Sequence, residues 1–188
     1  FFDDFTRFLV HKAFHQIPFL WAIHKVHHSA EYLTPFTVYR THPLEGIIFT
    51  LRSIFVQAIT ISLFVFLFAS KIDLVSIYGV NFVLFLFNIT GANLRHSHVN
   101  ISYGMFLEKI FISPAQHQVH HSISDKHRDK NFGAILAIWD LFGKSLYLSR
   151  PNQRIKFGVE NIGNLNLHKL STIYIYPFIE MGNYILAI

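Results

Sequence analysis

Two long apolar runs dominate the pattern of hydrophobic and polar positions. The first extends from Ile47 to Ser70 and contains Arg52 close to its start. The second extends from Leu74 to Leu94, with Asn81 and Asn88 as its strongly polar members. A helix needs roughly 20 residues to cross a bilayer core about 30 Å thick, and each run is long enough. The pattern therefore predicts two transmembrane helices, over about residues 47–70 and 74–94.

The connection between the two runs is short, Lys71-Ile72-Asp73, so the helices are expected to form an antiparallel hairpin. The segments before and after a hairpin lie on the same side of the membrane. Basic residues are concentrated there, at Arg7, Lys12, Lys25 and Arg40 before the hairpin and at Arg95, Lys109, Lys126, Arg128, Lys130, Lys144 and Arg150 after it. The connection has a single lysine, and the positive-inside rule then predicts that the flanking segments face the cytoplasm.

Shorter helical patterns flank the hairpin. Phe5 to Ile17 reads as a helix that stops at Pro18, and Leu20 to Ser29 reads as a second one. Ser113-Pro114 is a typical helix start, with serine as the N-cap and proline as the first helical residue. We therefore expect an all-α integral membrane protein, with a helical transmembrane hairpin and a histidine-rich cytosolic cap.

The pattern is weak beyond Pro151, where Ile173 to Ile188 resembles an apolar helix broken at Pro177. We therefore divide the chain into a membrane domain over residues 1–150 and a C-terminal tail of unclear structure over residues 151–188. The chain begins at Phe1 without an initiator methionine or a signal-peptide pattern. The expectation is a fragment that lacks an N-terminal portion, including one or more spans.

Composition supports a membrane location. Apolar residues make up 52% of the 188 residues, phenylalanine occurs 21 times, and the mean hydropathy is +0.35. The net charge of +5 comes from scattered basic residues beside apolar segments, which favours contact with anionic lipid and not with nucleic acid. Cysteine is absent, which excludes disulfides, thiolate ligands and iron–sulfur clusters.

A repeated histidine motif is the strongest chemical signal. His24 to His28 and His117 to His121 both read H-x-x-H-H, followed by serine. Positions i, i+3 and i+4 share one helical face, so each motif presents three imidazoles together. A further pair has the spacing i, i+4, and one histidine follows the second apolar run. Nine histidines thus converge from four segments: His11, His15, His24, His27, His28, His96, His117, His120 and His121.

Imidazole is a ligand for iron, zinc, copper and nickel. Nine nitrogens suit two metal ions with four or five protein ligands each, and leave positions for water, oxygen or substrate. No H-E-x-x-H motif is present, so a zinc metalloprotease would lack its general base. A histidine-rich metal transporter would need ligands inside the spans, which contain none. A zinc-dependent membrane hydrolase that uses the same ligands remains an alternative, because the residues do not distinguish iron from zinc.

Three other histidines are further candidates for ligation: His42, His98 and His127. His98 follows His96 by two residues, so a regular helix would turn it away. Ligating histidines usually donate their second ring N–H to a nearby acceptor. Candidate carboxylates for that role are Asp4, Glu31, Glu45 and Asp129.

The histidine motifs resemble the fatty acid hydroxylase / sterol desaturase superfamily, especially bacterial members of the sterol desaturase family. The resemblance covers roughly residues 3–150 and rests on HKAFH and HKVHHS near the N-terminus, RHSHVN at Arg95 to Asn100, and SPAQHQVHHSISDKHRDKNFG at Ser113 to Gly133. It implies a cytosolic cap with a non-haem dimetal centre, normally two Fe ions, ligated by the nine histidines above. The chain departs from the family pattern at Val10-His11-Lys12 and at His96-Ser97-His98. One metal would then have fewer ligands or recruit His98 or His42.

The resemblance also implies a reaction. The expected activity is oxygen-dependent hydroxylation or desaturation of a lipid, with electrons from an external donor such as a ferredoxin or a b-type cytochrome. The expected location is the bacterial inner membrane, with the histidine motifs facing the cytoplasm. Sterol, fatty acyl and other lipid substrates all remain open, as does the choice between hydroxylation and desaturation.

Overall fold

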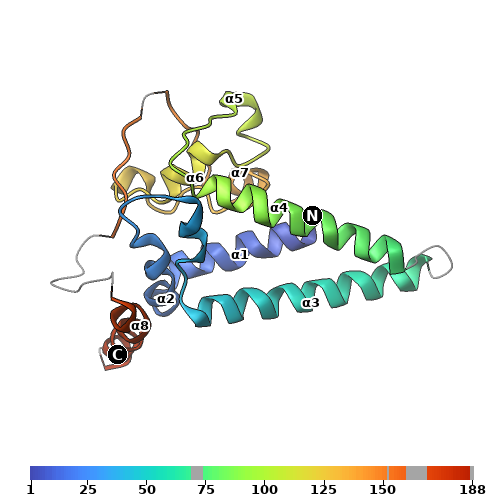
Figure 1. Cartoon of the computed structure of the whole chain (residues 1–188), viewed down its shortest axis with the longest axis horizontal. Helices are drawn as coiled ribbons and strands as arrows, with labels where there is room; N and C mark the ends of the chain where they lie inside the picture. The colour runs from blue at the N-terminus through green and yellow to red at the C-terminus, as the bar shows by residue number, and fades with distance from the viewer. Residues whose placement is uncertain (69–73, 152, 160–168, 187–188) are drawn as a thin grey trace.

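The computed structural model describes residues 1–68, 74–151, 153–159 and 169–186, and within these ranges it contains helices but no β-strand. Two long helices project from a cap made of shorter helices and loops (Figure 1). The elements in chain order are α1 (Phe2–Gln16), α2 (Pro18–His28), η1 (Pro35–Tyr39), α3 (Pro43–Phe68), α4 (Leu74–Arg95), α5 (Gly104–Leu107), α6 (Pro114–His120), η2 (Asp125–His127), α7 (Ile138–Phe142) and α8 (Leu170–Leu186).

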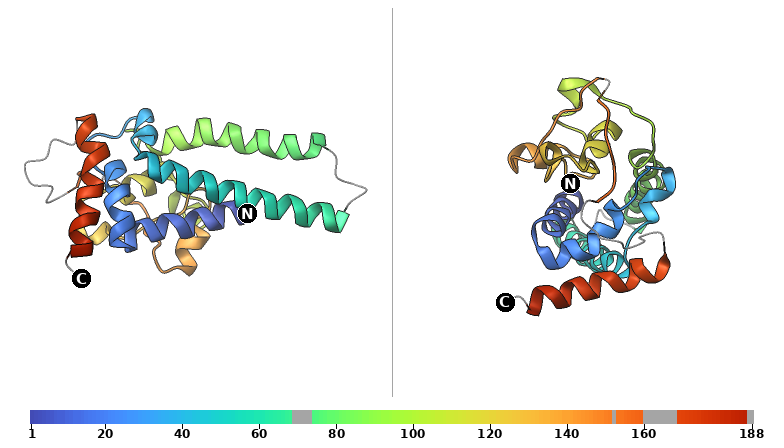
Figure 2. Two further views of the ribbon diagram at one scale, coloured as in Figure 1. Left: turned by 90° about the horizontal axis from the view of Figure 1, so that it is seen from below. Right: turned by 90° about the vertical axis from the view of Figure 1, so that its left-hand side faces the viewer.

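The two long helices correspond to the two predicted spans. Among the described residues, α3 is the helix that is long and apolar enough to cross a membrane, with a mean hydropathy of 2.0 in its most apolar window. Only 6% of that window is buried inside the protein, so α3 is not the core helix of a soluble domain. α4 runs antiparallel to α3 (Figures 1 and 2). That α3 and α4 cross a membrane remains a prediction, and the predicted connection at residues 71–73 lies outside the described residues.

A sharp corner brings α1 and α2 together. Pro18 disfavours helical geometry at the residue before it, and Ile17 is extended, with φ −99° and ψ 114°. α1 therefore ends at Gln16, and Pro18 begins α2 as its first residue. The two helices pack through a small apolar core that contains Phe14 and Ile23. The predicted break at Pro18 is confirmed, and it turns the histidines of α1 towards those of α2.

The start of α6 is fixed by a capping box. The Ser113 hydroxyl accepts a hydrogen bond from the Gln116 backbone N–H at 3.1 Å, and the Gln116 side chain accepts one from the Ser113 N–H at 3.0 Å. The Gln116 amide also donates to the backbone carbonyls of Glu108 and Tyr147. The predicted helix start at Ser113-Pro114 is confirmed, and these bonds set the position of the second H-x-x-H-H motif.

A buried loop, residues 131–136, closes the cap over α1 and α6. The Asp140 carboxylate accepts hydrogen bonds from the backbone N–H groups of Phe132 (2.8 Å) and Gly133 (2.6 Å). Asp4 accepts from two further N–H groups of the loop and from the Trp139 indole. A Cβ at Gly133 would lie 2.6 Å from the Leu136 carbonyl oxygen, so only glycine fits there. Two carboxylates from distant parts of the chain thus hold one loop.

The C-terminal helix α8 runs across the end of the helical bundle and packs on α2 (Figure 2). The predicted break at Pro177 is wrong, because α8 continues from Leu170 to Leu186. Pro177 leaves the Ile173 carbonyl oxygen without its helical donor. The His42 ring lies 3.2 Å from the carbonyl oxygen of the next residue, Tyr174, and so contacts α8. An ion pair between Lys25 and Glu180 also holds α8 to α2. The two-part division at residue 150 remains a prediction.

Candidate metal centre

The structure brings all nine predicted histidines together in two adjacent groups. Within each group, one nitrogen of every imidazole lies within 4.8 Å of one nitrogen of every other. The first group is His11, His15, His24, His28 and His120, and the second is His27, His96, His117 and His121. The groups touch where the His28 and His121 rings stack with centroids 4.4 Å apart. The arrangement offers five and four ligands to two neighbouring ions.

Each H-x-x-H-H motif contributes to both groups. The outer histidines of the first motif belong to the first group, and its middle member, His27, belongs to the second. In the second motif, His117 and His121 belong to the second group, and the middle member, His120, belongs to the first. Residues on an α-helix are separated by about 100°, so i and i+4 differ by about 40°, whereas i+3 lies on the other side of i. The spacing of the motif therefore divides its histidines between the two groups.

Backbone carbonyls orient several of the imidazoles through Nδ1. His11 Nδ1 lies 2.7 Å from the Phe132 carbonyl oxygen, and His120 Nδ1 lies 2.8 Å from that of Lys130. His96 and His27 have the same type of partner, the carbonyl oxygens of Ala92 (2.8 Å) and Arg40 (3.2 Å). His24 Nδ1 lies 3.0 Å from a Glu45 carboxylate oxygen. The four carbonyl oxygens only accept hydrogen bonds, so the Nδ1 atoms of His11, His27, His96 and His120 carry the proton and their Nε2 atoms present a lone pair.

The Nε2 atoms meet at distances that suit a bound cation. His96 Nε2 lies 3.0 Å from His27 Nε2, and both rings already carry their proton on Nδ1. His117 Nε2 lies 2.9 Å from the same His96 atom and 3.2 Å from His121 Nε2. His27 and His96 both present a lone pair at Nε2, and two lone pairs at that distance repel unless a positive charge lies between them. Among the described residues, the Nε2 atoms of His15, His24, His28 and His120 are also buried without a hydrogen-bond partner.

Protons are poorly suited to supply that positive charge. Burial, followed by the neighbouring histidines, holds the pKa of His11, His15, His28, His96, His117 and His121 well below the usual value. Burial is also the main reason that the pKa of His27 falls to about 4 and that of His120 to about 3. The rings are therefore neutral near pH 7, as metal ligation requires. The residues fit a pair of metal ions.

The three further candidates lie outside both groups. His42 is buried, with its ring nitrogens near the Tyr174 carbonyl oxygen and the Leu44 N–H. His98 is exposed. His127 lies 2.7 Å from the Ser122 hydroxyl and 2.8 Å from the Gln153 amide.

Of the four candidate carboxylates, Glu45 lies against a ring nitrogen, that of His24. Asp4 instead holds the loop at residues 131–136. Sequence reasoning missed the carbonyl oxygens of Ala92, Lys130 and Phe132, because every residue has a carbonyl group and no residue type marks these.

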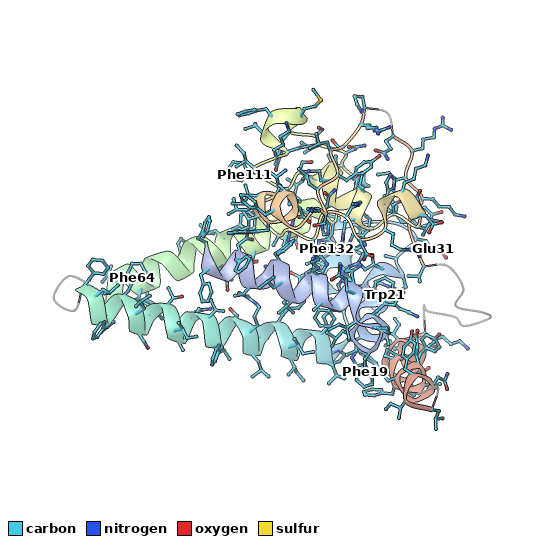
Figure 3. All side chains as sticks on the ribbon, turned by 180° about the vertical axis from the view of Figure 1, so that it is seen from behind. Phe19, Trp21, Glu31, Phe64, Phe111 and Phe132 are labelled. Atoms are coloured by element: carbon cyan, nitrogen blue, oxygen red, sulfur yellow. The ribbon has the colours of Figure 1, made fainter. Side chains whose placement is uncertain are left out.

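Cavities reach the histidines from two sides. One cavity of about 380 Å³ is lined by His15, His28, His120 and Trp21, together with polar residues of the cap. A second, of about 160 Å³, lies against His11, His24, His27, His96 and His117. Phe132 packs edge-on against the His11 and His120 rings. Figure 3 shows Phe132 and Trp21 in the cap, away from Phe64 near the far end of the long helices.

The fatty acid hydroxylase family model matches residues 1–145, which include all nine histidines. The chain belongs to this family. The resemblance expected from the histidine motifs is therefore confirmed. Both histidine groups, which could hold metal ions, lie within the matched residues of this fatty acid hydroxylase family member.

Several curated proteins are similar to the chain along most of its length. Alkylglycerol monooxygenase of Caenorhabditis elegans is 29% identical over 94% of the chain and 33% of its own length. Alkylglycerol monooxygenase of Danio rerio is 28% identical over 94% of the chain and 35% of its own length. Human lathosterol oxidase is 25% identical over 77% of the chain and 42% of its own length. The chain spans about a third of the two monooxygenases, and no solved structure matches it.

Proposed function

We propose that this fatty acid hydroxylase family member is a membrane-bound, oxygen-dependent lipid hydroxylase or desaturase with two non-haem iron ions. One observation carries the proposal: nine imidazoles from four helical or adjoining segments form two groups, and within each group the ring nitrogens lie within 4.8 Å of one another. The proposed ligands are His11, His15, His24, His28 and His120 for one ion and His27, His96, His117 and His121 for the other. When bound, the iron pair would supply the activation of dioxygen.

The surrounding residues would hold the ligands in place and keep water away. Carbonyl oxygens fix the Nδ1 protons of His11, His96 and His120, so these rings cannot change tautomer without losing a hydrogen bond. Phe14 and Phe132 are almost fully buried beside the rings and exclude water from that side. Neutral ligands leave the positive charge of the ions largely uncompensated, which favours reduction by an external donor.

The names of the relatives support a lipid substrate. They include monooxygenases of alkylglycerols, and a lathosterol oxidase and a Δ7-sterol 5(6)-desaturase, both named for sterols. That this chain oxidises a lipid is part of the proposal, because the chain covers only part of the length of each relative. A zinc-dependent hydrolase remains the rival, since imidazole also binds zinc. A metal transporter is disfavoured, because α3 and α4 contain no histidine along which an ion could pass.

We further propose that α3 and α4 cross the bilayer and that the histidine side faces the cytoplasm, where most of the basic residues lie. Lys126 and Arg128 are exposed near the larger cavity and would dock an acidic electron donor, a ferredoxin or a b-type cytochrome. The relatives named above are eukaryotic, so a bacterial inner membrane stays a prediction from the sequence.

The test is metal and oxygen dependence in the purified protein. Protein loaded anaerobically with Fe²⁺ should bind two ions per chain and consume oxygen only with a lipid substrate and a reductant. His120→Ala should lower both the metal content and the turnover, whereas His98→Ala, which changes an exposed histidine outside both groups, should leave both unchanged. Product formed at the same rate under strict anaerobiosis would reject the oxygenase in favour of the hydrolase.

A further inference from the structure

The cap exposes large apolar side chains on the side that faces the hairpin. Met105 and Phe106 of α5 are 75% and 76% exposed, and Phe142 at the end of α7 is 79% exposed. Figure 1 shows α5 and α7 on the side of the cap from which α3 and α4 project, and Figure 3 shows Phe111 on that side as well. We call the exposed large side chains of these two segments the apolar patch: Tyr103, Met105, Phe106, Phe111, Leu141 and Phe142.

Backbone hydrogen bonds join the two segments of the apolar patch. Phe111 lies opposite Leu136 in an isolated antiparallel bridge, and the Ala137 N–H donates to the Ile110 carbonyl oxygen at 2.8 Å. α7 begins directly after Ala137. The segment with Phe111 and the segment with Phe142 are therefore parts of one hydrogen-bonded framework.

A buried carboxylate holds the loop that carries α5. Glu108 is buried, and it accepts hydrogen bonds from the hydroxyl groups of Ser102 (2.8 Å), Ser113 (2.7 Å) and Ser149 (2.7 Å). The bond to Ser102 closes the loop on one side of α5, and the bond to Ser113 ties it to the start of α6. The apolar tip of α5 is thus held in an exposed position by polar groups that are themselves buried.

The charges of the two segments favour an anionic surface. Residues 99–111 and 138–144 all lie in the described part of the chain and contain two acids, Glu108 and Asp140. Both acids are buried and accept hydrogen bonds from serine hydroxyls. The two basic residues, Lys109 and Lys144, are exposed. The outer surface of these segments therefore carries two positive charges beside its apolar side chains, and no negative one.

The apolar patch also continues the exposed surface of α4. Ile89 and Leu94 near the end of α4 are exposed, and so are Val99 and Ile101, which lead from α4 to α5. The side of the cap away from the hairpin is different, since exposed Arg128 and Asp129 line the larger cavity there together with Trp21 (Figure 3). Exposed apolar patches of this kind mark contacts with a partner or a membrane. Continuity with α4 favours the membrane.

We propose that the apolar patch inserts into the interface of the bilayer leaflet next to the cap, and that Lys109 and Lys144 contact anionic phospholipid headgroups there. The inference rests on the proposed crossing of the bilayer by α3 and α4, which turns this side of the cap towards the membrane. Aromatic side chains favour the membrane–water interface, and exposed lysines beside it are attracted by anionic lipid. Apolar faces at such an interface are typically buried about 5–10 Å into the boundary between headgroups and acyl chains. The insertion would hold both histidine groups at a fixed height above the leaflet.

Spin-label depth measurements test the inference without requiring turnover. The chain has no cysteine, so Phe106→Cys, Phe142→Cys, Phe64→Cys and Lys126→Cys can each carry a single nitroxide label. The whole chain, with diamagnetic Zn²⁺ added, is reconstituted in vesicles of phosphatidylcholine and phosphatidylglycerol. Collisions of each label with oxygen, which concentrates in hydrocarbon, are compared with collisions with a water-soluble nickel chelate. We expect the oxygen-to-nickel ratio at positions 106 and 142 to be several-fold higher than at exposed Lys126 and lower than at Phe64 in α3.

The lysines are tested by removing charge from the protein and from the lipid. Lys109→Gln combined with Lys144→Gln should lower the ratio at position 106 at least about twofold, and vesicles without phosphatidylglycerol should lower it similarly in the unsubstituted background. Lys126→Gln combined with Arg128→Gln is the matched control, because it removes two exposed positive charges outside the two patch segments. The control should leave the ratio unchanged. An equal effect of both pairs would overturn the assignment of the lysines.

The labels also separate a failure of this inference from a failure of the proposed hairpin. Ratios at positions 106 and 142 as low as at Lys126, with a high ratio at Phe64, would reject the insertion and leave the crossing by α3 standing. A low ratio at Phe64 as well would overturn both. Labels at positions 106 and 142 that collide rarely with either reagent would mean that protein covers the patch, and broadening between labels would identify a second copy of the chain as that partner. Either result would replace the membrane contact with a protein interface.

Discussion

Asp140 has no contact with the histidines, yet we expect it to set the metal affinity of the first group. Its carboxylate accepts hydrogen bonds from the N–H groups of Phe132 (2.8 Å) and Gly133 (2.6 Å) and from the Ser145 hydroxyl (2.5 Å). The Phe132 carbonyl oxygen, in turn, lies 2.7 Å from His11 Nδ1. Asp140 therefore positions the acceptor that fixes the proton of a proposed ligand.

The perturbation is Asp140→Asn, which keeps the shape of the side chain but replaces one acceptor with an NH2 donor. That donor would face the N–H of Phe132 or Gly133, or the hydroxyl of Ser145. Leaving one buried N–H unsatisfied costs about 1–3 kcal/mol of folding free energy. Loss of the partner behind a metal-ligating histidine typically lowers metal affinity about 10- to 100-fold. We expect both effects together, because one loop carries both interactions.

The assay is chelator competition for the metal, combined with thermal unfolding of the metal-free protein. Asp125→Asn is the control, since Asp125 is exposed and pairs with exposed Arg128 on the surface. The control should change neither measurement. A lower unfolding temperature for Asp140→Asn with wild-type metal affinity would refute the reasoning, because the loop would then stabilise the cap without orienting His11.

Two further predictions concern the site and the membrane. Glu45→Gln should weaken metal binding about 10- to 100-fold, since Glu45 lies 3.0 Å from His24 Nδ1; chelator competition measures this, and an unchanged affinity would show that His24 needs no carboxylate. The chain has no cysteine of its own, so a single one replacing Ser70 should react with an impermeant thiol reagent in intact cells, whereas one replacing exposed Lys126 should not. The reverse labelling pattern would overturn the proposed orientation.

The histidine pattern predicted the composition of the cluster well, because helical spacing alone decides which imidazoles share a face. The sequence also predicted the helix break before Pro18 and the capped helix start at Ser113, since both depend on local backbone chemistry. The continuity of α8 through Pro177 could not be predicted from the sequence. The packing against α2 and the ion pair between Lys25 and Glu180 outweigh the local effect of the proline. A pairing across 155 positions leaves no local signal in the sequence.

The groups that support the imidazoles were also beyond sequence reasoning. Phe132 supplies a carbonyl oxygen to His11, although the two residues are 121 positions apart. Asp4 was one of four candidates for orienting an imidazole, but its carboxylate instead holds the loop that contains Phe132. The sequence marks acids that can accept a hydrogen bond, whereas the tertiary structure decides which donor reaches each of them.

The division of each H-x-x-H-H motif between the two groups has a thermodynamic consequence. An ion in the first group would fix α2 through His24 and α6 through His120, and those helices also carry His27 and His117 of the second group. Ordering the ligands for one ion therefore reduces the entropy cost of binding the other, because both ions use the same two helices. We predict that the metal-free protein takes up its two ions in one steep, cooperative step. Titration with Fe²⁺ under anaerobic conditions measures this, and two well-separated binding steps would show that the groups fold around their ions independently.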